Sequence, residues 1–123
     1  MKSFILLIIS SLLFIIQACS FSSEAQLEKG KLLMKEGKFR EALDFLNKAV
    51  ESDPKNVEAL NARGVVYFEL KEYTNALLDY EQALKINPNY YRPYYNRALL
   101  KMAQNDGNGA LKDYAEAIRL DPN

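Results

Sequence analysis

The sequence predicts an all-α fold built from three copies of a helix pair. A proline recurs every 34 residues, at Pro54, Pro88 and Pro122, and a small residue keeps the same interval at positions 30, 64 and 98. Three further columns repeat with this spacing: Ala42, Ala76 and Ala110; Ala49, Ala83 and Ala117; and the bulky Leu46, Tyr80 and Tyr114. A fixed period in so many columns is typical of stacked repeats that share one core.

Each repeat is expected to consist of two antiparallel helices. Proline follows the second helix of each pair, because it lacks an amide donor and restricts the residue before it. We expect Ser22 or Ser23 to cap the first helix, with Gln26 completing a capping box from Ser23. The predicted helices are residues 24–36, 40–52, 58–70, 74–86, 92–104 and 108–120.

The third repeat departs from the other two in its turn and at its end. Gly107 stands where Phe39 and Tyr73 occur earlier, and glycine near a helix start weakens the helix by up to about 1 kcal/mol relative to alanine. We therefore expect this repeat to be the least stable. Its second helix carries an apolar strip that would ordinarily pack on a following repeat, formed by Leu111, Tyr114 and Ile118. Either long side chains fold over this strip, or it binds a partner or a second copy.

These columns resemble the tetratricopeptide repeat (TPR) family, best in LNARGVVYFELKEYTNALLDYEQALKINP from Leu60 to Pro88. The resemblance implies a right-handed superhelix of repeats 23–56, 57–90 and 91–123, whose first helices line a concave groove for another protein. By the family pattern, the groove positions are Glu24, Leu27, Lys31, Met34, Glu58, Asn61, Val65, Phe68, Arg92, Tyr95, Leu99 and Met102. The alternative is that some of them, above all Met34 and Phe68, pack between helices.

Aromatic residues gather at the start of the third repeat. Tyr94 takes the motif's large core position, whereas Tyr90, Tyr91 and Tyr95 are either contact anchors or packing between repeats. Together with Arg92, Tyr95 belongs to the residue types most often found at binding hot spots.

The resemblance also bears on two sets of charged residues. Some TPR proteins hold a C-terminal carboxylate with a clamp of lysine, two asparagines, a lysine and an arginine. Of the corresponding residues here only Arg92 keeps the expected charge, so we expect no clamp; they are Leu27, Lys31, Ala62, Arg92 and Asn96. Separately, Arg63 and Arg97 share one column while Asp79 and Asp113 share another, which predicts ion pairs within or between repeats.

Residues 1–18 are expected to be a signal peptide. Lys2 precedes an apolar stretch, residues 4–16, that is shorter than the about 20 residues needed to span a bilayer. Ile16-Gln17-Ala18-Cys19 resembles a bacterial lipobox, which implies cleavage before Cys19, its acylation and a tether at 19–22, although Gln17 departs from the usual small residue. Ser20 after the cysteine implies the outer membrane. The alternatives are an uncleaved anchor and an ordinary signal peptide.

Composition favours binding over catalysis. Sixteen basic residues balance sixteen acidic ones, which argues against nucleic acid as a partner. Without histidine, and with Cys19 committed to the anchor, the usual bases, nucleophiles and metal ligands are missing, so we expect no enzyme activity, cofactor or metal. We expect a membrane-tethered adaptor or scaffold of the bacterial envelope. The alternatives are an assembly factor for outer-membrane secretin or pilus components, a scaffold for cell-wall enzymes, and a structural homodimer through the third repeat.

Overall fold

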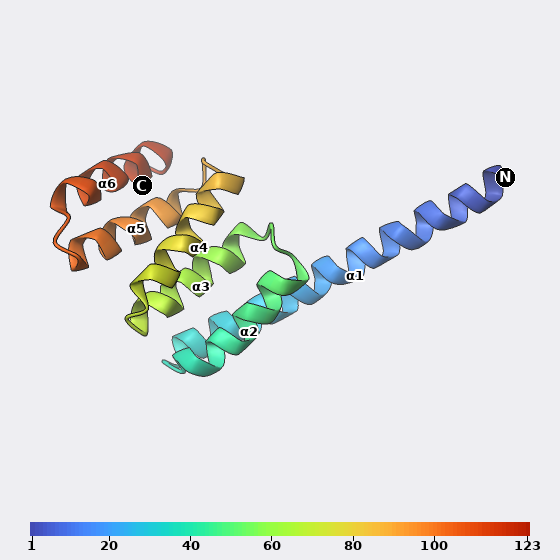
Figure 1. Cartoon of the computed structure of the whole chain (residues 1–123), viewed down its shortest axis with the longest axis horizontal. Coiled ribbons are helices and arrows are strands. Elements are labelled where there is room, and N and C mark those ends of the chain that lie inside the picture. Colours follow the sequence, from blue (N-terminus) through green and yellow to red (C-terminus); the bar gives the residue numbers. More distant parts are fainter.

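The computed structural model describes the side chains of residues 1–15, 17 and 22–123, and these residues form α-helices and no strand. The predicted all-α fold is confirmed. The helices are α1 (Lys2–Lys35), α2 (Phe39–Ser52), α3 (Val57–Glu69), α4 (Tyr73–Ile86), α5 (Tyr91–Ala103) and α6 (Gly107–Leu120). They stack as three antiparallel hairpins, α1 with α2, α3 with α4 and α5 with α6 (Figure 1).

Helices α2 to α6 each begin one residue earlier than predicted and end within one residue of the expected position. The proline columns account for this agreement. In the turn around Pro54 the Asp53 carboxylate accepts the Lys55 amide at 3.0 Å, and around Pro88 the Asn87 side chain accepts the Asn89 amide at 3.1 Å. These turns place each new helix in the same register.

Helix α1 differs from the prediction, because it begins at Lys2 and not near Glu24. Residues 2–29 contain neither proline nor glycine, so nothing in this stretch breaks a helix. The predicted cap and capping box are wrong. Ser23 lies inside α1, where its buried hydroxyl donates to the Ala49 carbonyl at 2.8 Å and accepts from the Asn56 side chain at 3.1 Å. The division into signal peptide, tether and repeats remains a prediction.

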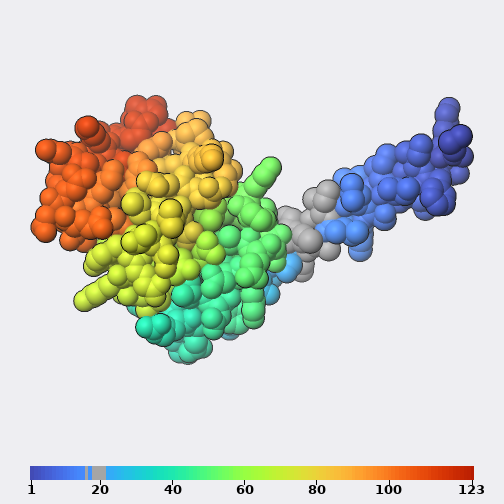
Figure 2. All heavy atoms as spheres, in the orientation of Figure 1, coloured from blue at the N-terminus to red at the C-terminus, as the bar shows by residue number. Residues whose placement is uncertain are grey.

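The N-terminal part of α1 extends away from the repeats (Figures 1 and 2). Its large apolar side chains from Phe4 to Ile15 are about half exposed or more, and none belongs to the hydrophobic clusters of the repeats. A search of the described residues finds no helix with the length and hydropathy needed to cross a membrane.

The core lies between the hairpins and depends on close helix approaches. One cluster joins Leu27, Leu46 and Val66, and a second joins Ala76, Tyr80 and Leu100. At the column of small residues, a Cβ atom added to Gly64 would lie 2.5 Å from the Tyr80 ring, and one added to Gly30 would lie 2.7 Å from Leu46. Glycine is therefore favoured at these two positions, whereas the third repeat accommodates the fully buried Ala98 in the same column.

The predicted arginine–aspartate pairs are confirmed, each within its own repeat. Arg63 binds Asp79 through two hydrogen bonds of 2.8 and 2.7 Å, and Arg97 binds Asp113 with the same two distances. Lys101 adds a third contact to Asp113 at 2.8 Å. These bidentate bonds fix the first helix of a repeat on the second.

The ion pair of Asp113 with Arg97 makes the free energy of unfolding depend on pH in the acidic range. Burial raises the pKa of Asp113, but bonds from Arg97 and Lys101 outweigh it, so the pKa lies below the usual value. A lowered pKa contributes stability above the unfolded pKa of about 3.9, and this stability is lost as the pH falls through the folded pKa. We expect the unfolding temperature of Asp113→Asn to fall less steeply than that of the unmodified chain as the pH drops below about 4. Unfolding temperatures of both proteins across this range test it, and equal slopes would contradict it.

Two glycines at the start of α6 are expected to respond oppositely to alanine. A Cβ atom at Gly107 meets nothing within 4 Å, so Gly107→Ala should stabilise the chain by up to about 1 kcal/mol. A Cβ atom at Gly109 would lie 2.1 Å from the Asp106 carboxylate, which caps α6 by accepting the Gly109 amide at 2.9 Å. Gly109→Ala should therefore cost about 1 kcal/mol through the lost cap. Thermal unfolding of both variants measures this, and a change of the same sign would refute it.

Candidate functional site

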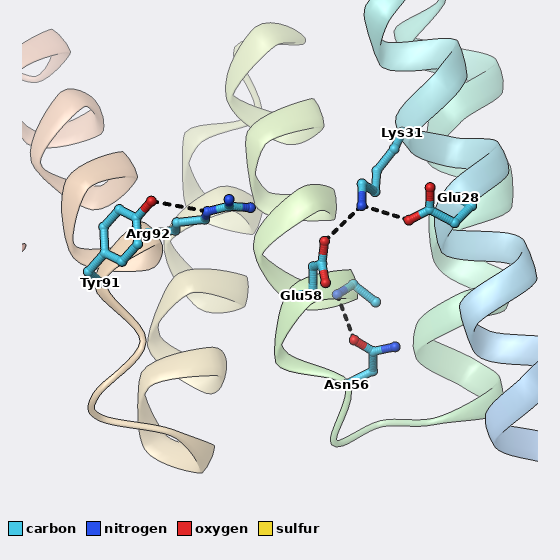
Figure 3. A network of polar contacts seen from close by, with 7 residues as sticks. Glu28, Lys31, Asn56, Glu58, Tyr91 and Arg92 are labelled. Carbon is cyan, nitrogen blue, oxygen red and sulfur yellow. Dashed lines mark hydrogen bonds and ion pairs between the residues drawn. The ribbon is translucent and has the colours of Figure 1, made fainter. Parts of the chain in front are cut away.

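The concave face is formed by α1, α3 and α5, the first helices of the repeats. Lys31 of α1 lies between two carboxylates, with its amino group 2.6 Å from Glu28 and 2.8 Å from Glu58 of α3 (Figure 3). These contacts raise the pKa of Lys31, with Glu28 the larger contributor. On α5 the exposed Arg92 donates to the Tyr91 hydroxyl at a long 3.4 Å, and it forms no ion pair among the described residues. The lysine is thus neutralised, while the arginine is open to a ligand.

An apolar stripe accompanies these charges. Val65 of α3 and Leu99 of α5 occupy the same column as Lys31; Val65 is partly buried and Leu99 is 37% exposed. Leu99 follows Arg92 by seven residues, two helical turns, so both lie on one face of α5. The concave face near α5 therefore offers a cation and an apolar side chain to the same ligand.

Two predicted groove residues lie in the interfaces between repeats. Leu27 is fully buried in the core beside Ala59 and Ala62 of α3, so the prediction that it lines the groove is wrong. Asn61 is nearly buried, and its side-chain oxygen accepts a 2.9 Å hydrogen bond from Asn96 of α5. Both occupy one repeat position, which the next repeat covers.

The remaining predicted groove positions divide between packing and exposure. Met34 and Phe68 are partly buried against the two core clusters, in agreement with the packing alternative. Glu24 is exposed on α1. Met102 is exposed at the far end of α5. Fewer residues therefore line the groove than the family pattern implies.

Tyr95 follows Arg92 by three residues and precedes Leu99 by four, so it lies on the same side of α5 and also reaches the outer face of the third repeat. There it borders a cleft of about 340 Å³, which we call the end cleft, lined by Tyr91, Tyr95, Tyr114, Ala117, Ile118, Asp121 and Asn123. The rings of Tyr95 and Tyr114 meet at 5.7 Å with an interplanar angle of 62°. The sequence placed Tyr95 in the groove and Tyr114 with Ile118 on a separate surface, and the structure joins them.

Tyr94 is not part of the end cleft and is only partly buried, less than its motif position predicts. Its hydroxyl donates to the Pro88 carbonyl at 3.0 Å, and the Arg97 guanidinium lies 5.7 Å from its ring centre. Tyr94 therefore stabilises the turn between the second and third repeats through this hydrogen bond.

Within the described part of the chain, no group of three or more acidic, cysteine or histidine side chains is placed to hold a metal ion. The predicted lipidation site, Cys19, lies outside the described residues.

Comparison with known proteins decides the family. Tetratricopeptide repeat models match residues 27–91 and 91–123. The chain belongs to the TPR family. Its three repeats form the right-handed superhelix that the resemblance implied, and the TPR domain is a protein–protein interaction module.

Among TPR relatives, RNA polymerase II-associated protein 3 is 33% identical in Xenopus tropicalis and 34% identical in Homo sapiens, over 79 and 76 residues. These matches cover 64% and 62% of this chain but only 12% and 11% of the relatives' own length. A TPR and J domain-containing co-chaperone of Cryptococcus neoformans is 31% identical over 88 residues, which is 71% of this chain and 17% of that protein.

Solved structures agree with this assignment. The first TPR domain of Spaghetti (RPAP3), bound to the HSP90 peptide SRMEEVD, is 33% identical with a TM-score of 0.81, over 85% of this chain and 82% of that one. MamA is 27% identical with a TM-score of 0.76, over 82% of this chain and 59% of that one.

Proposed function

We propose that the chain binds a segment of another protein on its concave face, through Arg92 and Leu99 of α5. The observation that carries this is the exposed Arg92 guanidinium two turns from an exposed leucine on the same helix face. A segment that offers a carboxylate to Arg92 and an apolar side chain to Leu99 satisfies both. The peptide bound by the similar Spaghetti domain, with two glutamates and a terminal aspartate, supports an acidic ligand.

The ligand is expected to differ from that peptide in how it is held. Three of the positions that correspond to the carboxylate clamp are not free to contact a ligand. Leu27 is buried, Lys31 is neutralised by two glutamates, and Asn96 donates to Asn61. An internal acidic and apolar segment fits this face better than a free C-terminal carboxylate.

Affinity capture from a membrane extract of the source cells tests the binding face. A hydrogen bond to a charged group contributes about 1.5–3 kcal/mol, so Arg92→Ala should reduce capture about tenfold or more. Leu99→Ala should also weaken it. Leu78→Ala, exposed on α4, should leave capture unchanged. Full capture by Arg92→Ala would refute the proposed face.

We infer further that an acylated Cys19 tethers the chain to the bacterial envelope, most simply at the outer membrane. Support comes from the lipobox-like Ile16-Gln17-Ala18-Cys19 and from the exposed apolar side chains of residues 4–15, which pack on no repeat. Several acyl chains hold a protein at a membrane far more firmly than one. The tether would confine partner binding to that surface, as in an adaptor or scaffold without catalytic activity.

Metabolic labelling with an alkyne analogue of palmitate tests the tether. The chain should incorporate the label, and Cys19→Ser should abolish it. Gln17→Ala replaces the atypical lipobox residue by a small one and should be labelled at least as strongly. Label that persists in Cys19→Ser would rule out acylation at this cysteine.

A further inference from the structure

The outer face of the third repeat is uncovered, whereas the same face of the second repeat is covered by α5. Ile118 is 62% exposed, while its counterpart Leu84, 34 residues earlier, is 8% exposed. Tyr95 is 49% exposed, while its counterpart Asn61 is 7% exposed. The chain thus presents at its end a surface that it buries elsewhere.

The repeats themselves show what covers such a face. On the first repeat the cover is α3, which packs Ala59, Ala62 and Val66 against the core. On the second repeat the cover is α5, whose Pro93 and Leu100 at the matching positions are fully buried. The cover is therefore a helix with alanine or proline at i, alanine or asparagine at i+3 and an aliphatic residue at i+7.

Helix α1 matches this pattern at i and i+7 and has a glutamate at i+3, on a face that the described part of the chain leaves open. The matching residues are Ala25, Glu28 and Leu32, all exposed, with Leu32 at 49%. This face is where a preceding repeat would pack. We propose that copies of the chain associate head to tail, with α1 of one copy lying over the end cleft and along α5 and α6 of the next.

The polar residues at such a junction would correspond to a hydrogen-bonded pair between two repeats of the chain itself. Between the second and third repeats, Asn96 donates across the interface to Asn61 at 2.9 Å. The residues at these two positions in the junction are Glu28 of the covering helix and Tyr95 of the covered repeat. A phenol donor meets a carboxylate acceptor there, and Lys31 stays 2.6 Å from Glu28 to balance its charge.

This contact is heterologous, since two different surfaces meet, and it can therefore extend beyond a dimer. It leaves Arg92 and Leu99 on the concave face, so the association is independent of the proposed partner binding. It also differs from a two-fold homodimer in which two end clefts face each other.

Asymmetric disulfide cross-linking of the full chain in mild detergent tests the proposal. In a Cys19→Ser background, chains with Leu32→Cys and one tag are mixed with chains carrying Leu111→Cys and another tag, then oxidised. Leu32 and Leu111 correspond to Leu100 and Leu77, which belong to one hydrophobic cluster across the second and third repeats. Both positions are exposed, so folding is preserved. The expected product has twice the chain mass and carries both tags. Adding Tyr95→Ala to the Leu111→Cys chain should reduce it.

Controls separate the other outcomes. Leu78→Cys, exposed on α4, should give no product with Leu32→Cys. Cross-linking of Leu111→Cys only to itself would show two-fold pairing and overturn the proposal. An absence of cross-links, or equal products from Leu78→Cys and Leu111→Cys, would overturn it as well.

Discussion

Replacing Tyr80 by alanine is expected to lower the free energy of unfolding by about 3–5 kcal/mol. The Tyr80 ring is 1% exposed and fills the space between Gly64 and the core residues Ala76 and Leu100. Its removal leaves a cavity that the surrounding helices cannot close, because the second and third repeats are packed together there. Thermal unfolding of the full chain in mild detergent measures the loss, since 1 kcal/mol corresponds to about 4–8 °C in a domain of this size.

The matched control is Tyr114→Ala, the same column one repeat later. Tyr114 is only partly buried and borders the end cleft, so its truncation should cost about 1 kcal/mol. A loss as large as that of Tyr80→Ala would mean that the third repeat is covered in solution. In that case Tyr114→Ala should again cost less stability than Tyr80→Ala once the chain is diluted to a monomer.

Asp79→Leu is expected to cost about 2–3 kcal/mol. The variant leaves the Arg63 guanidinium without its bidentate partner in a partly buried site, where a lost partner commonly costs 3–5 kcal/mol when burial is complete. The lower figure reflects the 20% exposure of the Arg63 side chain and its remaining 3.1 Å bond to Asn47. Thermal unfolding at neutral pH measures the loss.

The double variant Arg63→Met with Asp79→Leu separates charge from packing. Apolar residues of similar volume often replace an ion pair without loss, so the double variant should recover most of the stability. If it is as unstable as Asp79→Leu alone, the loss arises from shape and the ion pair is not what holds the two helices of the repeat together.

The sequence predicted the helices and the ion pairs well because both depend on columns spaced by 34 residues. Proline ends a helix except when it falls in the first turn, as Pro93 does, so the turns at Pro54 and Pro88 fixed the register of the helices that follow them. Likewise Arg63 and Asp79 recur together as Arg97 and Asp113. Two oppositely charged residues that recur at the same repeat positions are expected to contact each other.

Features that depend on contacts between repeats or between residues far apart in the sequence were harder to predict. Leu27 belongs to a groove column by position, yet α3 lies over it, and only the stacked structure reveals which columns a following repeat buries. At the same position in the third repeat no described helix lies over Tyr95, so it stays exposed and borders the end cleft. Ser23 resembled a helix cap, but its hydroxyl binds the Ala49 carbonyl 26 residues away, a contact that no local pattern contains.

Photo-cross-linking in the source cells tests most directly whether the concave face binds a protein segment. A photoreactive benzophenone amino acid is placed at Leu99 on that face or at Leu78 on α4, both exposed. We expect a discrete cross-linked product from Leu99, no product from Leu78, and loss of the Leu99 product when Arg92→Ala is added. Products of equal yield from both positions, or a Leu99 product that Arg92→Ala leaves unchanged, would contradict binding through this face.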